Sequence, residues 1–187
     1  LVPFWGVILA SALVSLGLAG LIWACVPKEE PERETSRLTF DLSFIRAGGE
    51  FTVECNPETV TPELMGVLRE GGVTRVSMGA QSFEAKHLKT LERWHDPENV
   101  ARALAVSRAA GISRDSVDLI YAVPGQTLDE WRRDLETALS LNTLHLSCYN
   151  LTYEPNTAMT ARLARDEFSP VDEDTEVDMF LLTADLL

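Results

Sequence analysis

The chain has 187 residues, of which 45% are hydrophobic and 24% charged, and its formal net charge is −13. This length fits one domain with an appended segment, and the composition is ordinary for a globular protein. The acidic charge argues against a nucleic-acid partner, because phosphate binding needs clustered Lys and Arg.

The three cysteines, Cys25, Cys55 and Cys148, match no local metal-binding spacing. Their odd number argues against a disulfide scaffold, so we expect a reducing compartment and a cytoplasmic location for the globular part. The sequence therefore predicts no metal ligands.

Residues 1–26 contain no charged side chain. The run exceeds the roughly 20 residues that cross a bilayer, so we expect an apolar helix, a candidate membrane span and a point of membrane contact. A signal peptide is a weaker interpretation, because no basic residues precede the run. A third interpretation is that the segment is foreign to the downstream domain. Residues 27–48 are interpreted as a linker.

From residue 49 onward, strand-like and helix-like patterns alternate. Short runs rich in β-branched and apolar residues predict strands over 51–54, 75–80, 116–123 and 145–151. Apolar residues at helical spacing predict helices over 62–71, 82–94, 96–111, from 127 onward, and over 174–187.

Capping residues support these helices. Thr61 precedes a proline and an acidic first turn, and Gly71 is placed to end the same helix. Thr127 and Glu130 form the pattern of a capping box. Ser82 is expected to cap the second helix.

Strands separated by helices indicate parallel pairing through crossovers, in either a barrel or an open sheet. The first strand is followed by no glycine-rich phosphate loop, which disfavours a dinucleotide-binding fold. We therefore predict an α/β domain over residues 49–187, a partial parallel (β/α) barrel.

Ligand sites of parallel barrels lie at the carboxyl ends of the strands. Candidate residues at these ends are Glu54, Gln81, Arg93, Asp118, Tyr149, Asn150 and Thr152. Taken singly, each is better explained as a structural residue, but polar groups at successive strand ends favour a site.

Asp118 is the hardest of these to explain structurally. A carboxylate between Val117 and Leu119 costs several kcal/mol unless it has a partner. It needs a cation, a set of hydrogen-bond donors or a bound ligand, and Arg93 is the cation that we expect to pair with it.

Five motifs in order resemble one branch of the radical S-adenosylmethionine (SAM) family, which holds oxygen-independent coproporphyrinogen III oxidase and the heme chaperones. The strings are TVECNP, GVTRVSMGAQSF, LERWH, VDLIYAVPGQT and HLSCYNLTYEPNT, within residues 49–187. The last two strings are more similar to the chaperones than to the oxidase.

The resemblance implies about four of the six strand–helix units of a radical SAM barrel, with a 4Fe-4S cluster and S-adenosylmethionine as cofactors. It implies that Glu54 binds the ribose of the cofactor and that Thr152 touches the same molecule. Gln81, Arg93 and Asp118 match positions that contact a second S-adenosylmethionine. Heme or a porphyrin is the implied partner.

The chain departs from the family pattern. It has no C-x3-C-x2-C motif for the cluster and no Gly-Gly-Gly-Thr-Pro turn, and we expect truncation at both ends. The first hypothesis is a radical SAM protein of heme metabolism without cluster ligands, with no catalytic residue assigned. The alternative is an inactive fragment or membrane-anchored fusion.

Overall fold

The computed structural model describes residues 6–14, 18–26 and 49–187. Its elements in chain order are β1 (Gly6–Val14), β2 (Leu18–Val26), β3 (Phe51–Cys55), η1 (Pro57–Thr59), α1 (Pro62–Glu70), β4 (Arg75–Gln81), α2 (Ala85–Thr90), α3 (Asn99–Ala109), β5 (Arg114–Tyr121), α4 (Leu128–Ser140), β6 (His145–Asn150), α5 (Ala158–Leu163) and α6 (Glu173–Leu186).

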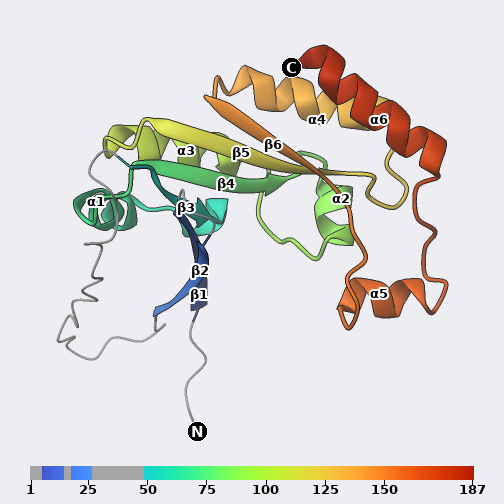
Figure 1. Cartoon of the computed structure of the whole chain (residues 1–187), viewed down its shortest axis with the longest axis horizontal. Helices are drawn as coiled ribbons and strands as arrows, with labels where there is room; N and C mark the ends of the chain where they lie inside the picture. Colours follow the sequence, from blue (N-terminus) through green and yellow to red (C-terminus); the bar gives the residue numbers. More distant parts are fainter. Residues whose placement is uncertain (1–5, 15–17, 27–48) are drawn as a thin grey trace, which may run out of the picture.

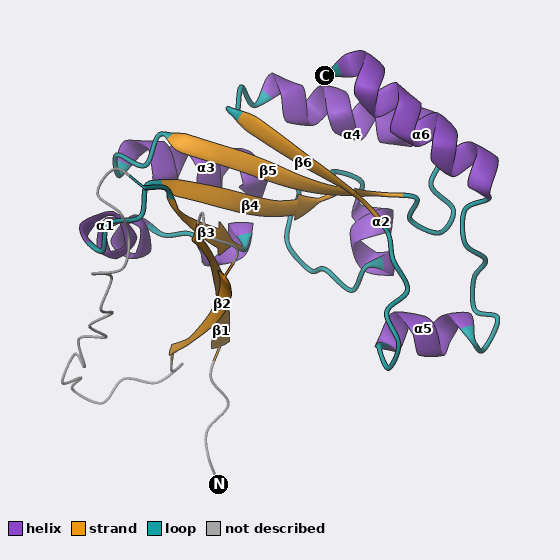
Figure 2. Cartoon of the chain, viewed as in Figure 1, coloured by secondary structure: helices purple, strands orange, loops and turns teal. Residues whose placement is uncertain are grey.

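The strands form one sheet in the order β2-β1-β3-β4-β5-β6. Within it, β3, β4, β5 and β6 are parallel neighbours in chain order, as Figures 1 and 2 show. Parallel neighbours need a crossover between them, and α1, the α2–α3 pair and α4 occupy these connections. The predicted α/β domain with four parallel strands is confirmed.

The apolar helix predicted over residues 1–26 is wrong. β1 and β2 are antiparallel strands, and β1 pairs antiparallel with β3. An uncharged run without periodicity does not distinguish a helix from strands, and pairing satisfies the backbone groups equally well. None of the helices in the described part of the chain is long and apolar enough to cross a membrane. The predicted linker, 27–48, lies outside the described residues.

The core lies between the four parallel strands and their helices. Alternate strand residues such as Val76, Val117 and Leu119 are fully buried and pack in one cluster with Trp131 and Leu135 of α4. Burying each such side chain stabilises the fold by about 1.5–3 kcal/mol. Because strand side chains alternate between the two faces of a sheet, the residues between these core positions point to the opposite face.

The predicted caps of α1 and α4 are confirmed. Thr61 Oγ1 accepts a hydrogen bond from Leu64 N at 3.1 Å, and Gly71 ends α1. Thr127 and Glu130 form the full capping box of α4.

The predicted helix over 82–94 is shorter than expected, because α2 covers only Ala85–Thr90. Ser82 does not cap it: its hydroxyl donates to Asp134 Oδ2 at 2.7 Å and accepts from Glu84 N at 3.1 Å. Glu92, with φ of 55°, leaves the helical region beyond the other end.

Glu130 joins α2 to α4. Burial disfavours its charged form, but hydrogen bonds from Lys86, Thr127 N–H and His87 lower the pKa of this carboxyl from 4.5 to about 2. A carboxyl group whose pKa is lower in the folded than in the unfolded chain stabilises the fold at pH values above its ordinary pKa of 4.5. This stabilisation is lost as the pH falls from 4.5 toward 2.

We therefore expect Glu130→Gln to lower the free energy of unfolding by about 1 kcal/mol at neutral pH. The difference from the parent chain narrows as the pH falls from 4.5 toward 2. Urea unfolding at several pH values measures it, with Glu136→Gln at an exposed position of the same helix as control. A loss of unfolding free energy in Glu130→Gln that is the same at every pH contradicts the lowered pKa of Glu130.

Candidate functional site

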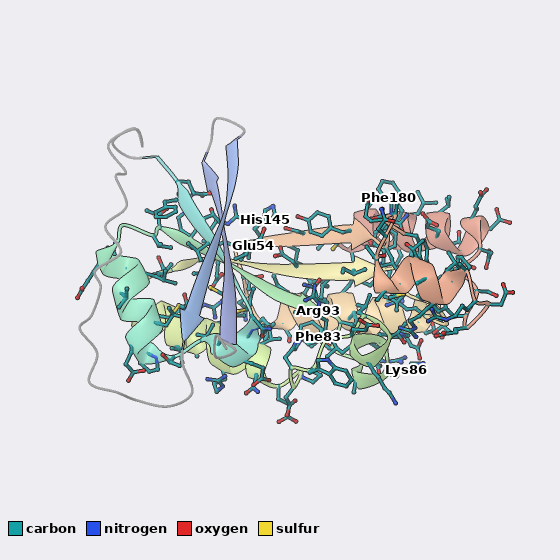
Figure 3. All side chains as sticks on the ribbon, turned by 90° about the horizontal axis from the view of Figure 1, so that it is seen from below. Glu54, Phe83, Lys86, Arg93, His145 and Phe180 are labelled. Carbon is teal, nitrogen blue, oxygen red and sulfur yellow. The ribbon has the colours of Figure 1, made fainter. Side chains whose placement is uncertain are left out.

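A row of polar side chains crosses the sheet face opposite the core. Register pairs Glu54 with Ser77, Ser77 with Ser116, and Ser116 with His145. Figure 3 labels Glu54 and His145, the two ends of this row. The row therefore runs across all four parallel strands on one face.

Asp118 lies on the same face as this row, two residues after Ser116 on β5. Its carboxylate is half-buried and accepts a bifurcated hydrogen bond from Ser77 Oγ, at 2.9 Å to Oδ1 and 2.8 Å to Oδ2. A neighbouring strand, not an arginine, thus supplies the partner that the sequence required.

The charge of Asp118 acts on the titration of Glu54. The pKa of Glu54 is raised by its burial and, second, by the negative charge of Asp118. Among the ion pairs of the described residues, none involves either carboxylate. Two acids on one sheet face that have no ion-pair partner among the described residues suit a ligand that brings positive charge or several hydrogen-bond donors.

Gln81 reaches the same face through a β-bulge. The pairing of β4 with β5 shifts between Gly79 and Gln81, and Gln81 adopts φ of 64°. Its Nε2 lies 3.0 Å from the place where a Cβ on Gly79 would stand, and Gly79 pairs with Asp118. Bulges re-aim side chains in this way. The structure therefore gathers Glu54, Gln81 and Asp118.

Arg93 does not pair with Asp118, and this prediction is wrong. Arg93 is exposed in the loop after α2. That loop is fixed at the carboxyl end of β4, because His95 Nε2 lies 2.9 Å from the carbonyl oxygen of Ala80. Arg93 thus lies at the same end of the sheet as Gln81, and its side chain is exposed to solvent.

Thr152 is exposed in the segment that follows β6. Leu151 N donates to Tyr121 O at 2.9 Å, which holds this segment against the end of β5. Thr152 is therefore at the expected end of the sheet, and no hydrogen bond joins it to the three gathered residues in this part of the structure.

The sequence did not reveal Asp134, which fixes the loops at the strand ends. It is 1% exposed and accepts hydrogen bonds from Ser82 Oγ and Phe83 N, both at 2.7 Å, and from Gln126 Nε2 at 3.5 Å. Burial raises its pKa, while the Phe83 and Ser82 hydrogen bonds act in the opposite direction. A lone acid within an amphipathic helix carries no signal of such a role.

The expected 4Fe-4S cluster does not fit the described residues. Cys55 and Cys148 alternate with Glu54, Ser147 and Tyr149 and so point to the core side. Burial raises the pKa of Cys55 to about 12 and that of Cys148 to about 11, which disfavours the thiolates that such a cluster needs. Over residues 49–187, no group of three or more His, Cys, Asp or Glu side chains could hold a metal ion.

Comparison with known proteins identifies related chains. A sequence model of the radical SAM superfamily matches residues 27–138, more than half of the chain. The heme chaperone HemW of Mycobacterium tuberculosis strain CDC 1551 is 38% identical over 134 residues, 72% of this chain and 34% of that protein. HemW of Escherichia coli K12 is 40% identical over 118 residues, 63% of this chain and 31% of that protein.

Among solved structures, coproporphyrinogen III oxidase (HemN) from Escherichia coli, a radical SAM enzyme, superimposes with a TM-score of 0.65 at 26% identity. The match covers 76% of this chain and 32% of that one. The chain thus spans about a third of the length of the relatives that it matches.

The coupling between the two acids can be measured. We expect Asp118→Asn to lower the pKa of Glu54 toward its ordinary value of 4.5, because the neighbouring negative charge is removed. Carboxyl carbon NMR titration measures the change, and Asp129→Asn, at an exposed position of α4, is the control. An unchanged Glu54 titration in Asp118→Asn contradicts the geometry of the site.

Proposed function

Because the chain belongs to the radical SAM superfamily, we propose that the sheet face of Glu54, Gln81 and Asp118 binds S-adenosylmethionine. The observation that carries the proposal is the pair of half-buried carboxylates that form no ion pair among the residues the structure describes. S-adenosylmethionine brings a sulfonium, an ammonium and two ribose hydroxyls, so it supplies both positive charge and hydrogen-bond donors to these two carboxylates.

Each residue has a separate part in this proposal. Glu54 accepts hydrogen bonds from the ribose hydroxyls, and Asp118, oriented by Ser77, faces the cationic part of a bound cofactor. The Gln81 amide offers a donor and an acceptor beside them. Arg93 and Thr152, from loops at the same end of the sheet, are proposed to close over the ligand. When bound, the cofactor supplies the adenosyl group that the superfamily uses in its chemistry.

We further propose that the chain is the cofactor-binding part of a heme chaperone-type protein. Identities of 38% and 40% to two HemW proteins support this assignment. Because these relatives are named heme chaperones, we propose heme as the partner of this chain. The 26% identity to the oxidase HemN is lower and gives less support to an oxidase assignment. The described residues do not fit a 4Fe-4S cluster, so the proposal for this chain is limited to binding of the cofactor.

The first experiment measures S-adenosylmethionine binding by isothermal titration calorimetry. We expect saturable binding by the parent chain and about tenfold weaker binding for Glu54→Gln and for Asp118→Asn, because each loses a charged acceptor. Asp129→Asn should bind as the parent does. An absence of binding, or equal affinity in all variants, contradicts the proposed site.

The second experiment tests the heme assignment. We expect hemin titrated into the chain to show a shifted and sharpened Soret band that saturates near one equivalent. Bovine serum albumin and free imidazole serve as references for nonspecific binding and simple ligation. A spectrum that matches hemin in buffer at every protein concentration contradicts heme as the partner of this chain.

A further inference from the structure

A hollow of about 460 Å³ lies between α2, the loop that follows it and α5. Its lining residues are Lys89, Thr90, Glu92, Trp94 and Arg162. Figure 1 shows α5 beside α2, and Arg162 Nη1 joins the two helices by donating to Thr90 O at 3.1 Å. Ligand pockets typically enclose about 300–1,000 Å³, so the hollow is large enough to be a second binding site.

Trp94 presents its indole ring to solvent at this hollow. It is 82% exposed, the highest value among the large hydrophobic side chains of the described residues. The backbone on both sides is fixed, because Arg93 N donates to Leu88 O at 2.8 Å and His95 Nε2 lies 2.9 Å from Ala80 O. An indole exposed on a fixed backbone is suited to stacking on a flat ligand.

Two cations line the hollow together with this indole. Arg162 pairs with Glu92 at 3.7 Å and with Glu167 at 3.2 Å, so these acids offset its charge. Lys89 is exposed and forms no ion pair among the residues that the structure describes. On a chain with a net charge of −13, the hollow therefore offers an aromatic face and a cation that can pair with an added carboxylate.

We propose that this hollow binds heme, with the porphyrin ring stacked on Trp94 and a propionate paired with Lys89. Heme joins a flat aromatic ring to two carboxylates, and the hollow offers a partner for each kind of group. These contacts recognise the ring and its propionates instead of the iron, so iron-free protoporphyrin IX binds as hemin does. The inference deepens the proposed function and rests on heme as the partner of this chain.

The affinity of variants for hemin, measured from the Soret band, tests the site. We expect about tenfold weaker binding for Trp94→Ala and about threefold weaker binding for Lys89→Gln, whereas Trp94→Phe retains most of the affinity because it keeps an aromatic face. Phe180→Ala and Arg132→Gln are the matched controls, because both residues are exposed on other helices. Protoporphyrin IX, followed by its fluorescence, should rank the variants in the same order.

Indole N–H NMR signals locate the bound porphyrin directly. The ring current of protoporphyrin IX should shift the Nε1–H signal of Trp94, which is assigned by its loss in Trp94→Phe. Trp131 is the internal control, because it is buried and its Nε1–H donates to Thr183 Oγ1 at 2.9 Å. Its signal should stay in place.

The outcomes separate the site from the partner. A parent chain that binds neither hemin nor protoporphyrin IX contradicts heme as the partner and overturns the site with it. Saturable binding that Trp94→Ala weakens no more than Phe180→Ala overturns the site alone, as does an unmoved Trp94 signal at saturation. Binding of hemin without binding of protoporphyrin IX also overturns the site, because the iron then carries the recognition.

Discussion

The half-burial of two carboxylates on one sheet face is the constraint on which the proposed site depends. Glu54 and Asp118 come from strands that are separated only by β4, and neither has an ion-pair partner among the described residues. The raised pKa of Glu54 reflects burial first and the charge of Asp118 second. Such an arrangement costs free energy in the free protein, and a cationic ligand with donors recovers that cost on binding.

The rest of the structure keeps these groups in place. On the core side, buried strand residues pack on α4, whose Asp134 also fixes the Ser82–Phe83 backbone after β4 and, through Gln126, the loop after β5. On the ligand side, a bulge turns Gln81 toward Asp118. One helix therefore holds both strand-end loops through the buried Asp134.

Sequence patterns predicted the features that local chemistry decides. The four parallel strands and the caps at Thr61 and Thr127 follow from alternation and from side-chain donors and acceptors close in sequence. The pattern failed where long-range contacts decide: Ser82 bonds to Asp134, 52 residues away, instead of capping a helix. The helix predicted over residues 1–26 was wrong because an uncharged run fits a helix or a pair of strands equally well.

The candidate site was also predicted only in part, because some of its contacts join residues far apart in the sequence. Glu54 and Asp118 stand on strands that parallel topology brings onto one sheet face, whereas the pairing of Asp118 with Arg93 depended on the path of the loop after α2, which the sequence pattern does not fix. The hydroxyls of Ser77 and Ser116 gave no signal, because a buried serine in a strand is common, and only the register shows that they bridge His145 and Asp118.

The central claim is that this acidic sheet face is the binding surface for S-adenosylmethionine. A crystal structure of the chain grown with the cofactor tests it most directly. The account predicts the ribose hydroxyls within hydrogen-bond distance of Glu54 and the cationic part of the ligand beside Asp118. A cofactor bound on the helix side of the sheet, or away from both carboxylates, would contradict it.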